Sequence, residues 1–274
     1  MLRALLAFLL RRPSSAQDTL CTVSHALRKR RGSSPRKKVS TLPFAMYLLS
    51  HVSSAVIPIV GQTSDPSTWL PLVASLDVVI DAVGGTEVKT LSETLLNAVA
   101  ATAQSARPVH APKLTYIYSS GTWVHGDDRT TIKTDISPIT APAGLVAWRP
   151  EQEQRVVTNT ILNGVVIRPG MLYGRSGSLF APLFQSASEG KVRWFGTPED
   201  RYALIHADDL AELYLLAAEK GQLVGGKIFD AVNDFTESAD DLLKKLVKVS
   251  GAQGPHEFVK PSNCECSSLI YNVT

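Results

Sequence analysis

The residues best suited to chemistry follow three short apolar runs of the sequence. Ser119, Ser120 and Thr122 come directly after the run at residues 114–118, and their hydroxyl groups could hold or exchange a proton. Arg168-Pro169-Gly170 ends the run that begins at residue 164, and Ala82-Val83-Gly84 ends the run that begins at residue 77. One such segment alone is equally well explained as a strand and a Ser/Gly turn. Three of them favour a shared rim of small and polar groups.

The elements that must position this rim are strands alternating with helices. Short apolar runs that stop at Ser or Gly are typical of buried strands in a parallel sheet, and ligands of such sheets lie beyond the carboxyl ends of the strands. The expected strands are residues 55–60, 77–82, 114–118, 164–168 and 227–232. The expected helices are residues 88–99, 151–162, 208–220 and 236–251, with a further one starting at the cap Asp65. The alternation predicts an α/β fold with a doubly wound parallel sheet.

Charge divides the 274 residues into two parts. Residues 1–40 hold ten Lys and Arg but a single acid, Asp18, whereas the remainder holds 18 basic and 24 acidic residues. We therefore predict a basic, disordered segment at residues 1–45 and one domain at residues 46–274. A transit peptide of mitochondrial type and a non-native extension remain alternatives for the first part, so we expect a cytoplasmic protein or, alternatively, a mitochondrial matrix protein.

The composition also narrows the classes of partner. The apolar run at residues 4–10 is too short to span a bilayer, and the acidic remainder argues against a nucleic-acid surface. The three cysteines form no disulfide framework and have no zinc-ligand spacing, which favours a reducing compartment and predicts no metal site.

Three motifs resemble the short-chain dehydrogenase/reductase superfamily, in its extended or atypical branch of NAD-dependent epimerases and dehydratases. They begin at Tyr116-Ile117-Tyr118-Ser119-Ser120-Gly121, at Arg168-Pro169-Gly170, and at Leu204-Ile205-His206-Ala207-Asp208-Asp209. The resemblance covers residues 55–250 and implies a Rossmann-like sheet, NAD or NADP as cofactor, and a small C-terminal substrate region. The implied substrate is a small molecule, either nucleotide-sugar-like or another carbonyl or alcohol. Implied cofactor contacts are Asp65, Ala82, Val83, Gly84, Ser119, Arg168, Pro169 and Met171. Implied catalytic residues are Thr122, Ser120 and Tyr173.

The sequence departs from the family pattern in several places. Gly32 is the only glycine before Gly61, so the glycine-rich turn that holds the pyrophosphate is absent. We expect the first strand and helix of the sheet to be missing or replaced by the basic segment. Trp148 and Gln152 stand where the family has the tyrosine and lysine of its Tyr-x-x-x-Lys motif, and neither can replace that chemistry. A C-terminal region cut short relative to the family is a further expectation.

Two hypotheses of function follow from this comparison. The first is an NAD(P)-binding oxidoreductase- or epimerase-like protein with an atypical catalytic site, in which His125 or Tyr173 could serve as a substitute acid or base. The second is a non-catalytic relic or truncated product that binds no dinucleotide. Arg168 could face a cofactor or pair with an acid. His206 is interpreted as a packed residue and Asp208 as a helix cap. Whether the protein is an enzyme stays open at this point.

Overall fold

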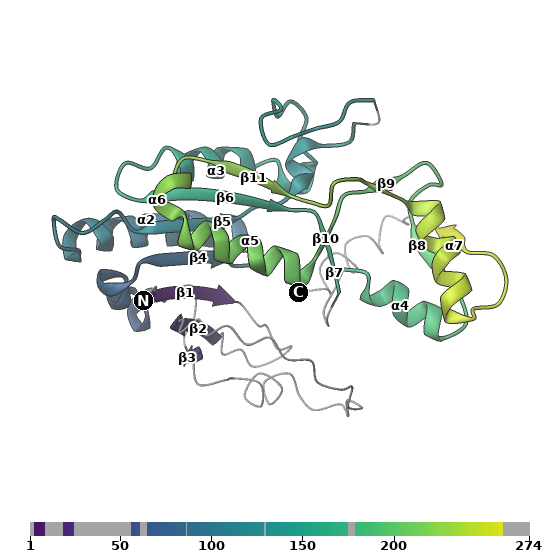
Figure 1. Ribbon diagram of the computed structural model, residues 1–274, viewed down its shortest axis with the longest axis horizontal. Helices are drawn as coiled ribbons and strands as arrows, with labels where there is room; N and C mark the ends of the chain where they lie inside the picture. The colour runs from purple at the N-terminus through teal and green to yellow at the C-terminus, as the bar shows by residue number, and fades with distance from the viewer. Residues whose placement is uncertain are drawn as a thin grey trace.

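The protein is built on a seven-stranded sheet in the order β11-β6-β5-β4-β1-β2-β3. The computed structural model describes residues 65–259 except 86, 129 and 175–178, together with the backbones of three preceding strands, β1 (Arg3–Phe8), β2 (Thr19–Ser24) and β3 (Val56–Val60). The five strands from β11 to β1 are parallel, while β2 is antiparallel to both of its neighbours. Figure 1 shows the sheet with its helices and a smaller group of elements beyond one end.

The predicted central strands and the helices between them are confirmed. They are β4 (Val78–Ala82), β5 (Thr115–Ser119), β6 (Asn163–Pro169) and β11 (Ile228–Ala231), with α2 (Val88–Ala106) and α3 (Arg149–Val157) as the crossovers. The helix expected at residues 151–162 starts earlier and ends sooner. It ends there because the side chain of Asn159 accepts hydrogen bonds from the backbone amides of Ile161 and Leu162 and forms a turn.

Helices cover both faces of the sheet, as a doubly wound fold requires. The period of two along each strand sends alternate side chains to opposite faces. Val79, Tyr116, Tyr118 and Val166 pack with α2, α3 and the short helix η2 (Leu70–Ser75). Val78, Ile80, Ile117, Val165 and Ile167 pack against α5 (Ala207–Glu219) and α6 (Gly221–Val224). The sequence pattern therefore specified the sheet and its two apolar layers.

Part of the N-terminal segment belongs to the sheet. We expected the first strand of the sheet to be missing or replaced by the basic segment, and the backbone of β1, which belongs to that segment, lies beside β4 and parallel to it. β1 consists of Arg3 and the first five residues of the apolar run at residues 4–10. That run is long enough to form a strand, although it is too short to span a membrane. Apart from β1 and β2, residues 1–45 lie outside the described residues, so for these other residues a disordered segment with its boundary at residue 45 stays a prediction.

The smaller group of elements beyond β6 forms its own apolar cluster. It contains β7 (Met171–Tyr173), α4 (Ala181–Ser188), β8 (Arg193–Phe195), β9 (Arg201–Tyr202), β10 (Leu204–His206), β12 (Glu237–Ser238), α7 (Ala239–Ser250) and β13 (Glu257–Val259). Phe180, Leu183 and Leu243 are its most buried members. Its strands have only two or three residues, too few for a period of two to predict them. Only α7, with Gly251 in the left-handed conformation at its end, was expected from the sequence.

Two predicted helix caps have different outcomes. Asp65 caps the short helix η1 (Pro66–Thr68), where its carboxylate accepts a hydrogen bond from the backbone amide of Ser67 at 3.2 Å. The prediction that Asp208 caps α5 is wrong. The cap is His206, whose Nδ1 accepts from the backbone amide of Asp208 at 3.2 Å. Among the described residues, no helix has the length and apolar character needed to cross a membrane.

Candidate functional site

The ends of β5 and β6 lie side by side at the carboxyl edge of the sheet. Ser119 is the register partner of Ile167, and the backbone amide of Ser120 donates to the carbonyl oxygen of Ile167 at 2.8 Å. Thr122 opens the short helix η3 (Thr122–His125), and its hydroxyl lies 3.4 Å from the carbonyl oxygen of Pro169. The predicted hydroxyl residues and the Arg168-Pro169 segment are thus brought together.

The end of β4 joins the same edge. Asp81 is the register partner of Tyr118 on β5, so the chain from Ala82 to Gly84 leaves the sheet next to the end of β5. Ala82 is half-buried, Val83 is buried and Gly84 is exposed. A side chain at Gly84 would meet no described atom within 4 Å. The three segments that the sequence predicted to share a rim therefore lie at one edge of one parallel sheet.

Arg168 points into a buried chain of polar groups rather than outward from the rim. Its Nε and Nη2 atoms donate to the two carboxylate oxygens of Glu153 on α3, at 3.1 and 2.6 Å, and both side chains are almost fully buried. Ser120 donates its hydroxyl to the same carboxylate at 2.5 Å. The pairing of Arg168 with an acid, one of two alternatives from the sequence, is the one that the structure shows.

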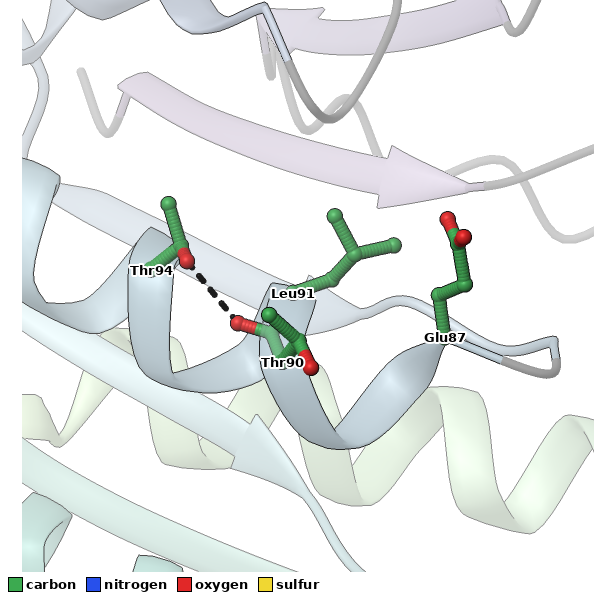
Figure 2. Close-up of a pocket in the computed structure, with 4 residues that line it drawn as sticks. All are labelled: Glu87, Thr90, Leu91 and Thr94. Atoms are coloured by element: carbon green, nitrogen blue, oxygen red, sulfur yellow. Dashed lines mark hydrogen bonds between the residues drawn. The ribbon is translucent and has the colours of Figure 1, made fainter.

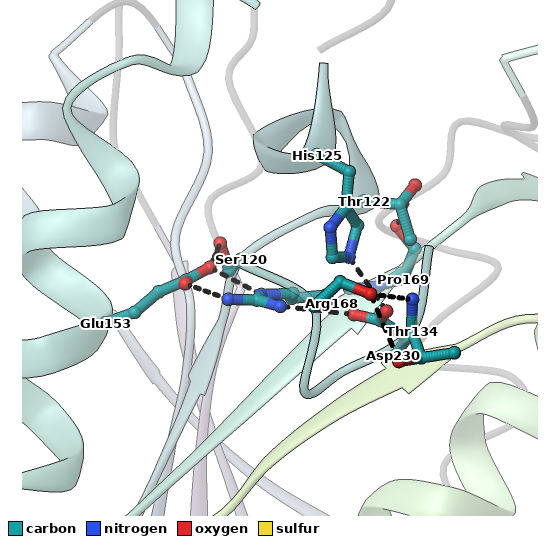
Figure 3. Close-up of polar contacts among 9 residues, drawn as sticks. Ser120, Thr122, His125, Thr134, Glu153, Arg168, Pro169 and Asp230 are labelled. Atoms are coloured by element: carbon teal, nitrogen blue, oxygen red, sulfur yellow. Dashed lines mark hydrogen bonds and ion pairs between the residues drawn. The ribbon is translucent and has the colours of Figure 1, made fainter. Parts of the chain in front are cut away.

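The same polar chain continues across β11 to the helix η3. Nη1 of Arg168 lies 3.5 Å from a carboxylate oxygen of Asp230, and the other oxygen of Asp230 lies 2.8 Å from Nε2 of His125. Figure 3 shows these side chains converging from β6, β11, α3 and η3. Burial lowers the pKa of Arg168, but the carboxylates of Glu153 and Asp230 more than offset this and raise it above its usual value. Arg168 therefore stays charged and ties four elements together.

A second polar cluster lies on the α2 and α3 face of the same edge. Asp81 accepts hydrogen bonds from the Tyr116 phenol at 2.8 Å and from the backbone amide of Val83 at 3.1 Å. Burial raises the pKa of Asp81 to about 6 and that of Tyr118 to about 12. Arg149, at the start of α3, donates from Nη1 to the phenol oxygen of Tyr118 at 2.8 Å and to the carbonyl oxygen of Ser119 at 3.0 Å.

Trp148 and Gln152, which stand at the positions of the family's catalytic tyrosine and lysine, contact neighbouring residues of the fold. Gln152 is buried, and its amide nitrogen donates to the carbonyl oxygen of Ser92, 3.1 Å away on α2. Trp148 precedes α3 and lies under the guanidinium of Arg149, with the guanidinium carbon 4.8 Å from the ring centroid. Neither side chain can act as the proton donor or the cation of the family motif.

The remaining predicted site residues lie in other settings. Ser119 accepts a hydrogen bond from the phenol of Tyr214 on α5, at 2.6 Å. Tyr173 is on β7, where its ring meets the imidazole of His206 edge-on at 5.1 Å. Met171 packs in the cluster around Phe180. Asp65 serves as a helix cap, as described above.

Sequence reasoning did not find Glu153, Asp230, Arg149 or Tyr214. Glu153 is one of two acids on an amphipathic helix, and Asp230 is the single acid of an apolar strand, and neither belongs to a motif. The one available signal was that a buried arginine on a central strand requires a carboxylate partner. Which carboxylate supplies it depends on the packing of α3 against β6.

A recess of about 260 Å³ lies beside this edge, on the first half of α2. Figure 2 shows the side chains that line it, Glu87, Thr90, Leu91 and Thr94, with the Thr94 hydroxyl bonded to the carbonyl oxygen of Thr90 at 2.9 Å. None of its lining residues belongs to the three strand ends. The recess is therefore separate from the candidate site.

Comparison with solved structures gives the same fold. The chain matches dTDP-glucose 4,6-dehydratase from Bacillus anthracis in complex with NAD, with 14% identity and a TM-score of 0.60 over 74% of this chain and 67% of that one. It matches a human epimerase family protein with NADPH, with 16% identity and a TM-score of 0.58 over 75% and 74% of the two chains. A conserved protein of unknown function from Silicibacter pomeroyi matches with 20% identity and a TM-score of 0.55 over 72% and 66%.

These matches establish the fold of the chain. It is the Rossmann-like fold of epimerase and dehydratase structures, as the motifs at Tyr116, Arg168 and Leu204 predicted. The chain spans about two thirds of the length of the Silicibacter pomeroyi protein and of the Bacillus anthracis dehydratase. No protein-family model matches the sequence, and no curated protein matches it.

Proposed function

We propose that this protein binds NAD or NADP at the carboxyl edge formed by β4, β5 and β6, as an oxidoreductase- or epimerase-like protein. The observation that carries the proposal is the register of these three parallel strands, which brings Ala82–Gly84, Ser119–Thr122 and Arg168–Pro169 to one edge. Ligands of open α/β sheets bind outside this edge. The solved structures of the Bacillus anthracis dehydratase and of the human epimerase family protein contain NAD and NADPH, which supports the choice of ligand.

The end of β4 fits a ligand that approaches the backbone closely. Gly84 has no left-handed backbone conformation, and a side chain there would meet no described atom within 4 Å. Neither backbone strain nor packing against described residues therefore requires a glycine at this position. A residue without Cβ leaves the backbone accessible, which suits the close approach of a ligand at this edge.

The phosphate cradle of the usual dinucleotide site has no counterpart after β1. Only ten residues separate β1 from β2, the two strands are antiparallel, and no glycine occurs between them. The usual site joins parallel strands through a glycine-rich turn and a crossover helix, and the glycine-free sequence between the antiparallel strands β1 and β2 does not match that unit. We infer that the cofactor is held by the ends of β4, β5 and β6 and binds more weakly than at a complete site.

The proton-transfer groups must also differ from those of the family motif. NAD(P), when bound, supplies or accepts a hydride, and the protein must then hold a proton near the reacting oxygen of the substrate. Ser120 donates its hydrogen to Glu153, which makes it a link between β5 and α3. Within the described ranges, the hydroxyl of Thr122 has no partner of comparable strength, since its hydrogen bond there is the 3.4 Å bond to the Pro169 carbonyl. Thr122, with Tyr173 as the second candidate, is the residue that we assign to the reacting oxygen.

The substrate that fits this proposal is a small molecule with a carbonyl or alcohol group, of which a nucleotide sugar is one class. The dehydratase with the same fold is named for dTDP-glucose, which supports this class. A nucleotide sugar carries the carbonyl or hydroxyl carbon and a diphosphate in one molecule.

The test compares NADH binding by variants of two glycines at which an added side chain would meet no described atom within 4 Å. Gly84→Val places a branched side chain at the proposed site, and Gly144→Val places it on the short helix η4 (Gly144–Val146), where a side chain also meets no described atom. We expect Gly84→Val to weaken NADH binding at least about tenfold, which corresponds to about 1.4 kcal/mol, with Gly144→Val unchanged. Equal affinities of the two variants would refute the location of the site, and circular dichroism verifies that both are folded.

A further inference from the structure

One cation at the carboxyl edge is not explained by the contacts that hold the fold together. Arg168 pairs with Glu153 and Asp230, and Arg155, on the same helix as Arg149, pairs with Glu93 and Glu151. Arg149 is half-buried, and the structure gives it no ion pair with a carboxylate in the described part of the chain. A partly buried charge that forms no ion pair is costly, which calls for an explanation.

The hydrogen bonds of Arg149 fix its guanidinium and leave one side of it open. Both bonds to described residues come from Nη1, to the Tyr118 phenol at 2.8 Å and to the Ser119 carbonyl at 3.0 Å. The rings of Trp148 and Tyr118 lie 4.8 and 5.8 Å from its guanidinium carbon. Nε and Nη2 donate to no residue in the described ranges, so three of the five N–H donors are available in a fixed orientation.

The open side of the Arg149 guanidinium lies where a ligand of the sheet would bind. Ser119 is the last residue of β5, so the guanidinium lies at the carboxyl edge where the proposed site is. Arg149 is also the first residue of α3, where the helix dipole disfavours a cation. Helix formation therefore does not account for an arginine here, whereas a guanidinium held in place suits a carboxylate or a phosphate bound through two parallel hydrogen bonds.

We propose that Arg149 binds an anionic group, a carboxylate or a phosphate, of a ligand at the carboxyl edge of the sheet. The proposal deepens the proposed function, on which it rests only for the identity of the molecule that carries the anion. Two sources are possible, the diphosphate of the dinucleotide and an acidic group of the substrate. Both present the same chemistry to the guanidinium.

A competing explanation is that Arg149 serves as the counter-charge of buried carboxylates. The acids that face its surroundings are Asp81 on β4 and Glu153 on α3. Glu153 is already paired with Arg168. Asp81 has two hydrogen bonds of its own, and the positive charge of Arg149 is the smallest of the influences on its pKa. A lysine at position 149 would still supply such a counter-charge but would lack the planar fork, which separates the two explanations.

The experiment is calorimetric titration of the full chain with sodium pyrophosphate at constant ionic strength. Arg149→Gln removes the charge and the fork, Arg149→Lys removes the fork alone, and Arg155→Gln is the matched control on the same helix. Losing one charge-assisted bond weakens binding about tenfold to a hundredfold, so we expect Arg149→Gln to bind pyrophosphate more weakly by at least about tenfold. Arg149→Lys should recover only part of this loss, and Arg155→Gln should match the wild type.

Three results would overturn the proposal. These are unchanged binding by Arg149→Gln, an equal loss in Arg155→Gln, and full recovery in Arg149→Lys. Circular dichroism reports whether Arg149→Gln is folded, and Arg149→Lys decides the question if it is not.

Repeating the titration with NADH present identifies which molecule carries the anion that Arg149 binds. Mutual displacement assigns the anion to the dinucleotide, and simultaneous binding assigns it to the substrate. Failure of NADH to bind while pyrophosphate binding still requires Arg149 would contradict the proposed function alone.

Discussion

The pair of Glu153 and Arg168 should be among the most sensitive points of the fold. Its two hydrogen bonds measure 2.6 and 3.1 Å, and the two side chains are 0% and 3% exposed. Glu153→Gln keeps the shape of the side chain but turns an amide donor toward a guanidinium that also has only donors. Arg168 is then left with a single carboxylate, that of Asp230, at 3.5 Å. Removing one partner of a buried ion pair costs about 3 to 5 kcal/mol.

Urea unfolding followed by circular dichroism measures this cost. With a slope of about 2 kcal/mol per molar urea, the midpoint of Glu153→Gln should fall by about 1.5 to 2.5 M. The matched control is Glu151→Gln on the same helix, because Glu151 is 74% exposed and its partner Arg155 is 42% exposed. Solvent screens such a pair, and we expect its midpoint to match that of the wild type within error.

The double variant Glu153→Met with Arg168→Met tests the physical reason. If the cost of Glu153→Gln comes from an uncompensated charge, replacing both partners by apolar side chains should recover much of the lost stability. Equal midpoints for Glu153→Gln and Glu151→Gln would show that the buried pair is unimportant. A double variant less stable than Glu153→Gln would show that the charge is not what destabilises the single variant.

Two further predictions concern the core. Burial raises the pKa of Asp81 from 3.8 to about 6, so the folded chain retains a proton that the unfolded chain releases, and the unfolding free energy should fall by about 3 kcal/mol as the pH rises through this window. Asp81→Asn should lose this dependence, and pH profiles of equal slope in urea melts would contradict it. A Cβ at Gly164 would lie 2.0 Å from the carbonyl oxygen of Val156, so Gly164→Ala should destabilise by about 1 to 3 kcal/mol. Gly144→Ala should leave the melting temperature unchanged, and a smaller effect at Gly164 than at Gly144 would contradict the packing.

The sequence predicted those parts of the fold that depend on periodicity. The strands ending at Ala82, Ser119 and Pro169 were found because each is a buried apolar run that ends in small or polar residues. The order of motifs gave the Rossmann-like fold. The short strands around Phe180 were missed because pairs and triplets of residues carry no detectable period. The place of β1 was missed because its composition suggested a disordered basic segment.

The candidate site was predictable only at the level of backbone segments. That Ser119, Ser120 and Arg168 follow parallel strands is enough to place them at one edge. The partners of their side chains depend on how α3, α5 and β11 pack on the sheet, which no local pattern encodes. The pairing of Arg168 with Glu153, and the open guanidinium of Arg149, therefore emerged only from the structure.

The most direct test of the central claim is a calorimetric titration of the unmodified chain with NADH and with NADPH. A complete glycine turn supplies charge-assisted bonds worth about 1.5 to 3 kcal/mol each, and losing two of them weakens a micromolar site at least about a hundredfold. We predict saturable binding of one of the two dinucleotides with a Kd of about 0.1 to 1 mM. Absence of saturable binding by either dinucleotide at millimolar concentrations would contradict the proposed cofactor site at the ends of β4, β5 and β6.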